Sequence, residues 1–224
     1  MYTRSVSTVL AVGLLSSAAT AASIPPRDSS PGVNIWNMAS SKQTFYFCNN
    51  AANGDGTADP GFTSGTSGCS NLVTSVAVAP SASTTVALAT TFSGRIARST
   101  DTPATWVEVQ FQSGGTAYGD VSLEIGCDGA ATVGPASGGG SAEVVGFSTP
   151  GDIVSAAPSG STETRADGVK VISAPYSEGK VTNQAAADYL EKAVPGGNKM
   201  AYITTTSGTD VTQSSNNQLN VKFY

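Results

Sequence analysis

Short runs in which apolar and polar residues alternate dominate the chain between residues 33 and 133. In the run from Val73 to Val78, Val76 and Val78 fall on one face, which is the period of a half-buried strand. Turn residues such as those at 80–83 separate the runs, and no helical crossover intervenes. The pattern therefore predicts an antiparallel β-sandwich or barrel. Further strands, rich in β-branched and aromatic residues, are expected at 33–37, 44–48, 84–88, around Ile96, 106–111 and 121–123.

The composition changes after residue 133. Residues 134–141 form a Gly-, Ala- and Ser-rich linker, and short apolar segments follow it. A helix is predicted over 182–193, because Thr182 or Asn183 can cap it and Pro195 with two glycines stops it. Its apolar residues share one face, so the helix is expected to dock on a core. Two closing strands are predicted at 200–206 and 219–223.

The N-terminus has the pattern of a secretory signal. Arg4 precedes an apolar run at 9–15, and small residues near 19–22 suit cleavage. The run is too short to span a bilayer, so the mature protein is expected to be soluble and extracellular. The predicted division is a signal peptide (1–22), a disordered Pro- and Ser-rich leader (23–32), a sandwich (33–133 plus 200–224) and a loop-rich subdomain with one helix (134–199).

Charge and composition exclude several functions. Without Arg4 the chain keeps ten basic and sixteen acidic residues, which argues against a nucleic acid or an anionic membrane as partner. The chain has no histidine, which excludes a Ser-His-Asp triad and most zinc sites. The segment Asn53 to Asp59 has some residues of a calcium loop but lacks the spaced carboxylates and distal Glu, so a surface turn is favoured. No cofactor or metal is expected.

Three cysteines are an odd number for an oxidising compartment. We expect a disulfide between Cys48 and Cys69, because the polar loop between them has few apolar anchors of its own. Cys127 is then the unpaired residue. A buried thiol is its favoured state, and a reactive or intermolecular thiol is the alternative.

Three further segments match consecutive strands of thaumatin-like proteins in order and spacing. They are Phe92-Ser-Gly-Arg-Ile-Ala-Arg98, Thr105-Trp-Val-Glu-Val-Gln-Phe111 and Gly119-Asp-Val-Ser-Leu123. The chain resembles a divergent, fungal-type thaumatin-like protein, since plant-type members carry many more disulfides. The resemblance implies an all-β, antiparallel sandwich with a small helix-containing subdomain, and a terminal strand paired inside the sandwich.

Members of this family that act on β-1,3-glucan use an Arg, a Glu and several Asp residues in one cleft. The resemblance places Arg95 or Arg98, Glu108 and Asp120 at such positions. Ile125 stands where another Asp is expected. Glu124 is adjacent, but it points to the opposite face if the strand continues, and Asp128 is in reach only if the chain bends back.

These residues allow three interpretations. They form an ion-pair network between strands, a ligand-binding cleft, or a catalytic pair made by Glu108 and Asp120. Arg95 beside this pair predicts that both carboxyls are ionised, which disfavours a general acid. Trp36 and Trp106 are either core residues, which their apolar surroundings favour, or platforms for sugar stacking.

Two functions follow. The first is a secreted, non-catalytic protein that binds an extracellular protein, such as a fungal virulence effector that inhibits a host apoplastic hydrolase, for example a protease. Its contacts would come from the loop at 49–68 and from segments beyond 134. The second is a cell-wall protein that binds β-1,3-glucan or hydrolyses it weakly. Ile125 at an acidic position favours the first function.

Overall fold

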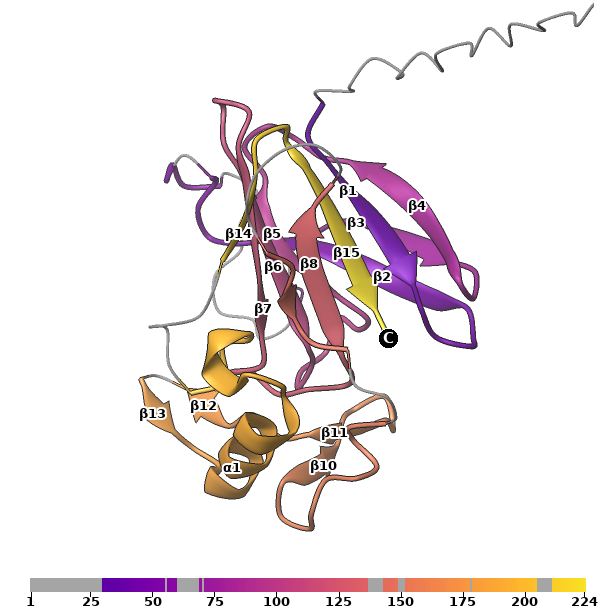
Figure 1. Cartoon of the computed structure of the whole chain (residues 1–224), viewed down its shortest axis with the longest axis vertical. Coiled ribbons are helices and arrows are strands. Elements are labelled where there is room, and N and C mark those ends of the chain that lie inside the picture. The colour runs from indigo at the N-terminus through magenta and orange to yellow at the C-terminus, as the bar shows by residue number, and fades with distance from the viewer. Residues whose placement is uncertain are drawn as a thin grey trace, which may run out of the picture.

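The computed structural model describes residues 30–54, 56–59, 69, 71–136, 143–148, 152–177, 179–204 and 211–224. The predicted signal peptide (1–22) and residues 23–29 of the predicted leader lie outside these ranges. The described residues form two packed sheets with a small helix-containing region at one end (Figure 1).

The larger sheet has six strands, and every neighbouring pair in it is antiparallel. Their alternating buried and half-buried residues follow the pattern read from the sequence. In sheet order the strands are β14 (Thr212–Ser214), β7 (Ala117–Ser122), β6 (Trp106–Phe111), β5 (Ser93–Ala97), β2 (Gln43–Asn49) and β3 (Leu72–Val78).

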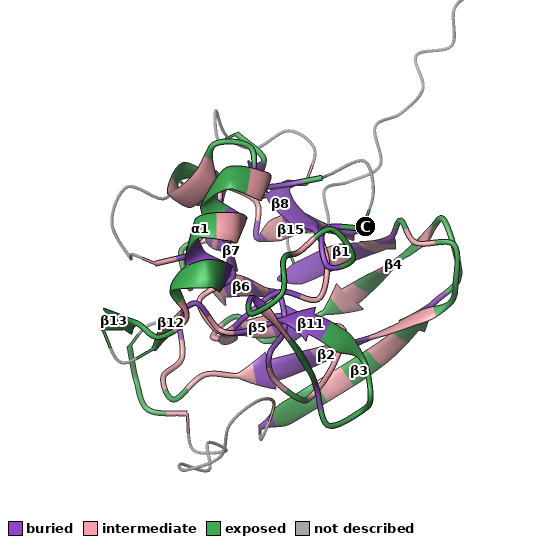
Figure 2. Cartoon of the chain, turned by 90° about the horizontal axis from the view of Figure 1, so that it is seen from below, coloured by how far each residue is buried: buried purple, intermediate pink, exposed green. Residues whose placement is uncertain are grey.

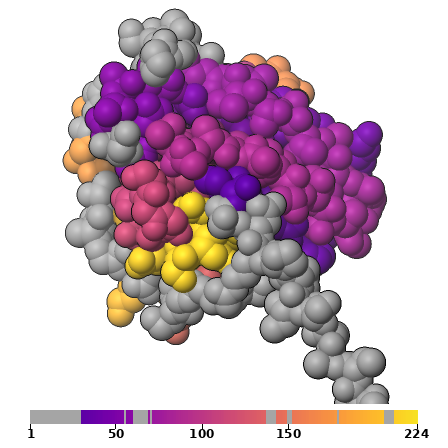
Figure 3. Space-filling view, turned by 90° about the horizontal axis from the view of Figure 1, so that it is seen from above, coloured from indigo at the N-terminus to yellow at the C-terminus, as the bar shows by residue number. Residues whose placement is uncertain are grey.

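The second sheet has five strands and contains one parallel pair. The parallel pair joins β1 to β15, with Val33 opposite Leu219, and the other strand pairs of the predicted antiparallel sandwich are antiparallel. Figure 3 shows the first described residues against the C-terminal segment. In sheet order the strands are β4 (Ala82–Ala87), β1 (Gly32–Asn37), β15 (Gln218–Phe223), β8 (Ala131–Pro135) and β9 (Val145–Gly146).

The core lies between the two sheets. Phe45 on β2 stacks on Phe223 on β15, with ring centroids 4.9 Å apart. Burying a large apolar side chain contributes on the order of 2 kcal/mol, so the many fully buried residues of both sheets hold the layers together. The predicted all-β sandwich is confirmed. Its largest buried side chains include Phe45, Phe47, Phe111, Phe223, Ile35, Ile96, Leu123 and Leu219.

The region after β9 contains two short hairpins and one helix. The hairpins are β10 (Thr162–Thr164) with β11 (Lys170–Ile172), and β12 (Tyr176–Ser177) with β13 (Lys180–Val181). Helix α1 (Gln184–Ala193) begins at Asn183, whose Oδ1 accepts the amide of Ala186 at 3.0 Å, and a 3-10 turn η1 (Gly197–Lys199) follows it.

The helix docks on the sandwich through the face predicted from its sequence. Ala186 and Leu190 are fully buried in the common core, and Tyr189 donates a hydrogen bond to the carbonyl of Ile153 at 2.7 Å. Figure 2 shows this buried side of α1 towards the strands, with its exposed side outwards.

Two predicted boundaries and one predicted strand differ from the structure. Gly32, assigned to the leader, begins β1, and β9 belongs to the sandwich although it lies inside the predicted 134–199 subdomain. The described part of the predicted strand 200–206 makes only an isolated bridge between Tyr202 and Ser122. The edge position is taken by β14 instead, whose polar sequence gave no strand signal although Thr212 and Ser214 are buried.

Candidate functional site

Arg95, Glu108 and Asp120 form one row across three neighbouring strands. In the register, Arg95 on β5 lies opposite Glu108 on β6, and Glu108 lies opposite Asp120 on β7. Residues next to them in sequence, such as Val107 and Val121, are fully buried between the sheets. Because side chains alternate along a strand, the row projects from the outer face of the six-stranded sheet. Directly opposite residues have Cβ atoms about 4.5–5.5 Å apart, so the three groups are close neighbours.

The row borders an open cleft of about 440 Å³. Most groups that line it are amides, hydroxyls and backbone, which exchange hydrogen bonds with uncharged polar ligands. Gln110 Nε2 also donates to the carbonyl of Gly54 at 2.6 Å, which fixes one wall. The lining residues are Asn50, Ser93, Gly94, Glu108, Val109, Gln110, Gln112, Tyr118, Asp120 and Val211.

Burial governs the charge of the row. It raises the pKa of Asp120 to about 8, and the neighbouring Glu108 and Glu124 raise it in the same direction. Burial also raises the pKa of Glu108, although Arg95 acts to lower it. The expectation that Arg95 holds both carboxyls ionised was therefore wrong: removing the carboxyls from water outweighs the attraction of one cation. At neutral pH the row holds at least one protonated carboxyl.

Glu124 belongs to the same cluster, which alternation along a strand did not predict. Strand β7 ends at Ser122, and a turn closed by the amide of Gly126 on the carbonyl of Leu123 at 2.9 Å follows. Glu124 in this turn raises the pKa of both Glu108 and Asp120. Glu124 therefore supplies a third carboxyl to the cluster, although Ile125 occupies the position at which the resemblance predicted another Asp. Gly126, two residues after Glu124, has a positive φ of 111°. A glycine at this position was the signal in the sequence that the strand gives way to a turn.

Two carboxyl oxygens of the cluster stand out. One oxygen of Asp120 and one of Glu124 are buried without a hydrogen-bond partner among the described residues. A buried polar atom without a partner is costly, which is expected where a ligand or water completes the site.

Arg95 lies over Trp106, with its guanidinium carbon 4.0 Å from the ring centroid. Trp106 is half-buried on the outer face of its sheet, beside the row. Trp36 is half-buried on the other sheet, and the Nζ of Lys222 lies 5.9 Å from its ring centroid. The expectation that both tryptophans are core residues was wrong, because each occupies an outward position of its strand. Burial lowers the pKa of Arg95, and Glu108 partly restores it.

Arg98 and Asp128, also predicted for the cleft, lie in a different cluster. Arg98 Nη1 is 3.0 Å from Asp128 Oδ1, and Arg165 Nη1 is 3.0 Å from Asp128 Oδ2. Arg98 also donates to the carbonyls of Ala130 (2.9 Å) and Tyr224 (2.7 Å). Arg98 is three positions after Arg95, and residues an odd number of positions apart on a strand point to opposite faces, so the two arginines do not share a face. Sequence reasoning missed Arg165, because its partner is distant in the chain.

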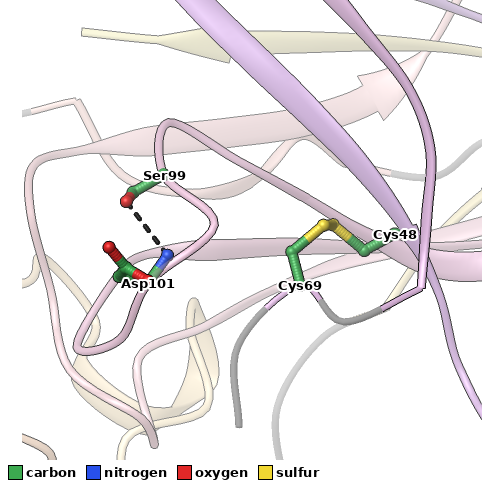
Figure 4. Close-up of a disulfide and its surroundings, with 4 residues drawn as sticks. All are labelled: Cys48, Cys69, Ser99 and Asp101. Atoms are coloured by element: carbon green, nitrogen blue, oxygen red, sulfur yellow. Dashed lines mark hydrogen bonds between the residues drawn. A yellow bond between two sulfur atoms is a disulfide. The ribbon is translucent and has the colours of Figure 1, made fainter. Parts of the chain in front are cut away.

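The loop after β2 is fastened at its base. Cys48 and Cys69 form the disulfide expected from the sequence, and the amide of Cys69 donates to the carbonyl of Thr100 at 2.9 Å, in the turn that Ser99 and Asp101 also form (Figure 4). Cys127 is a buried free thiol. Residues 60–68 of this predicted contact loop, and 137–142 of the linker, lie outside the described ranges.

The first part of this loop is a hydrogen-bonded turn. The amide of Asn53 donates to the carbonyl of Thr57 at 2.7 Å, and the amide of Asp59 donates to the carbonyl of Ala51 at 3.0 Å. Among the described residues, no group of three or more Cys, Asp or Glu side chains is arranged to hold a metal ion, and no helix is long and apolar enough to cross a membrane.

The chain is thus an all-β sandwich protein with an acidic cleft on the outer face of one sheet. No protein-family model matches it, and no curated protein matches its sequence. It has a likeness to the structure of the thaumatin-like xylanase inhibitor TLXI, with a TM-score of 0.37 and 12% identity over 87% of this chain and 99% of that chain. It also has a likeness to the protein elicitor MoHrip2 from Magnaporthe oryzae, with a TM-score of 0.35 and 12% identity over 53% of this chain and 78% of that chain. Likeness at this level says nothing about what this chain binds.

Proposed function

We propose that this chain is an extracellular, divergent thaumatin-like protein of fungal type that binds a neutral β-1,3-glucan in the acidic cleft. One observation carries the proposal: the Arg, Glu and Asp of the family's three segments, Arg95, Glu108 and Asp120, lie in a single cross-strand row, and Glu108 and Asp120 line the cleft. The disulfide between Cys48 and Cys69 supports an oxidising, extracellular compartment.

The chemistry of the cleft supports an uncharged polysaccharide. Gln110, Gln112 and Asn50 offer amides, and Tyr118 offers a ring and a hydroxyl, to sugar hydroxyls. A polyanion would meet a cluster with three carboxyls and one arginine, so acidic polysaccharides are disfavoured.

The carboxyl pair also supports weak hydrolysis. Glycoside hydrolysis needs one protonated carboxyl as acid and a second as nucleophile or base. Asp120, with a pKa raised to about 8, is protonated at neutral pH and adjoins Glu108 across the strands. The raised pKa removes the reason for expecting binding without catalysis.

The test combines binding and turnover. Purified protein is sedimented with insoluble β-1,3-glucan, and reducing-sugar release from laminarin is measured for wild type, Glu108→Gln and Asp120→Asn. Wild type should sediment with the glucan, and both variants should lose any sugar release. Asp101→Asn, an exposed carboxylate outside the cleft, is the matched control and should behave as wild type. A wild-type protein that stays in solution overturns the proposal.

A second candidate is the inhibition of an extracellular hydrolase by the loop after β2, as a virulence effector would inhibit a host apoplastic protease. The observation that favours it is the loop's pre-organisation: a disulfide closes its base, and internal hydrogen bonds order its first turn. Capture of a hydrolase from apoplastic fluid, with the enzyme's activity measured, tests it. Excess laminarin occupies the acidic cleft. If the hydrolase is still captured, it binds outside the cleft, as binding by the loop requires. If laminarin abolishes capture, binding by the loop is contradicted.

A further inference from the structure

Strands β3 and β4 form an open side of the sandwich. β3 is the last strand of the six-stranded sheet and β4 is the last strand of the five-stranded sheet. A tight turn joins them, with the amide of Ala82 on the carbonyl of Ala79 at 3.2 Å. Figure 2 shows the two strands on the same side of the molecule. In the described part of the chain, β3 pairs only with β2, and β4 pairs only with β1.

This side lacks most of the features that usually prevent edge strands from pairing, and its one bulge lies at the start of β3. Natural edge strands are protected by charged side chains, proline or bulges. No Asp, Glu, Lys or Arg occurs between Asp59 and Arg95, and neither strand contains proline. The register shift near Phe47 disturbs only the first residues of β3, so Thr74–Val78 is a regular segment.

The same side exposes apolar surface. Leu72 and Val73 are 51% and 48% exposed, although both are large apolar residues of a strand. A groove of about 490 Å³ opens between the two strands. Val73, Val86, Leu88 and Phe92 are among the residues that line it. Exposed apolar surface next to an unpaired strand edge marks a place where another strand binds.

We infer that a second copy of this chain adds its β3 to this edge, antiparallel and with Val76 on the two-fold axis. Two observations select a second copy. The chain carries a net charge of −5, so copies repel each other where their charged surfaces meet. β3 and β4 carry no charged side chain, and Asp59 is the charged residue among those that line the groove beside them, so pairing of β3 with β3 brings no like charges directly opposite each other.

The sequence of β3 is also compatible with itself in this register. Thr74 faces Val78 of the second copy, Ser75 faces its Ala77, and Val76 faces its own equivalent. No like charges meet, and apolar or small residues oppose each other on both faces. Pro80 of the second copy then comes opposite Leu72, which covers the exposed bulge. The interface is isologous, as a two-fold dimer requires.

The first test is the mass of the full mature chain by sedimentation equilibrium over a concentration series. Wild type should reach twice the mass of one chain. Ser75→Lys with Ala77→Lys places two pairs of opposed lysines at exposed positions and should raise the dimer dissociation constant by up to about 30-fold. Ser113→Lys with Ala185→Lys adds the same charge at exposed positions elsewhere and should dimerise as wild type. Circular dichroism checks that each variant is folded.

The second test is the register. Val76→Cys should form a disulfide-linked dimer on oxidation, because opposed Cβ atoms come close enough for a bridge. Ala77→Cys should not, since Ala77 opposes Ser75. A monomeric wild type, a dimer that tolerates the lysine pair, or equal cross-linking of the two cysteine variants would each overturn the inference. If wild type is monomeric and the Ser75→Lys, Ala77→Lys variant no longer captures a hydrolase, the edge of β3 binds another protein and not a second copy.

Discussion

Arg165 Nη1 lies 3.0 Å from Asp128 Oδ2, and this ion pair fastens the helix-containing region to the sandwich. Asp128 accepts from Arg98 at the same distance, and all three side chains are at most 10% exposed. The carboxylate of Asp128 is therefore shared by two largely buried cations, and Asp167 supplies Arg165 with a second carboxylate, 2.9 Å from its Nη2.

Asp128→Ala should lower the free energy of unfolding by about 3 kcal/mol, because Arg98 loses its carboxylate partner while Arg165 keeps Asp167. Urea denaturation measures the loss. Asp101→Ala, at an exposed position, should cost less than about 0.5 kcal/mol. Equal losses in the two variants would show that the ion pairs of Asp128 with Arg98 and Arg165 do not stabilise the fold.

The raised pKa of Asp120 predicts a pH dependence of stability. A carboxyl with a pKa of about 8 in the folded chain and about 3.9 in the unfolded chain stabilises the fold fully below pH about 4. This contribution falls as the pH rises through 8, by at most about 1.4 kcal/mol per pH unit. The unfolding free energy of wild type minus that of Asp120→Asn should therefore decrease between pH 5 and 8. A constant difference would mean that Asp120 titrates normally.

The two tryptophans offer a matched pair for the proposed glucan site. Trp106→Ala removes the ring that holds Arg95 beside Glu108 and Asp120. The variant should therefore bind glucan about 5- to 30-fold more weakly, a loss of about 1–2 kcal/mol. Trp36→Ala removes a similar ring from the other sheet and should leave binding unchanged. Isothermal titration with laminarin oligosaccharides measures both. A larger effect at Trp36 would place the binding surface elsewhere.

The three cysteines should differ in reactivity. Burial raises the pKa of Cys127 to about 11, so native protein should not react with iodoacetamide at pH 8, and denatured but unreduced protein should label at Cys127 alone. Replacing Cys48 and Cys69 by Ala should cost about 3 kcal/mol of unfolding free energy, the chain-entropy value for a loop of this length. Peptide mapping of the labelled protein identifies the thiol, and label on Cys48 or Cys69 would contradict the pairing.

The sandwich was predictable because its strands bury one face, and burial on one face leaves a period of two in the sequence. Val107, Val109 and Phe111 show this alternation, and it also fixed the outward direction of Glu108 between them. The helix was predictable from Asn183 and the stop after it, which are local signals. The division of the chain into domains stays a prediction apart from the boundaries corrected above.

What alternation could not predict lies where strands end. Glu124 lies two residues after the end of β7, and there a turn decides the direction of the side chain. The pKa values of the carboxyl row depend on how much water three strands exclude, which is not local information. The pairing of β14 with β7 joins polar sequences, and only the packed sheet makes it favourable.

The parallel pairing of β1 with β15 affects how the chain folds during synthesis. β15 lies between β1 and β8, so the five-stranded sheet has a gap in its middle until residues 218–223 leave the ribosome. Pairing over so long a sequence separation slows folding, because a large loop must close before any contact forms. Until then the apolar residues of β1 and β8 face each other across a missing strand. A nascent chain should therefore be unable to complete this sheet before residues 218–223 emerge, and removal of residues 218–224 should prevent folding.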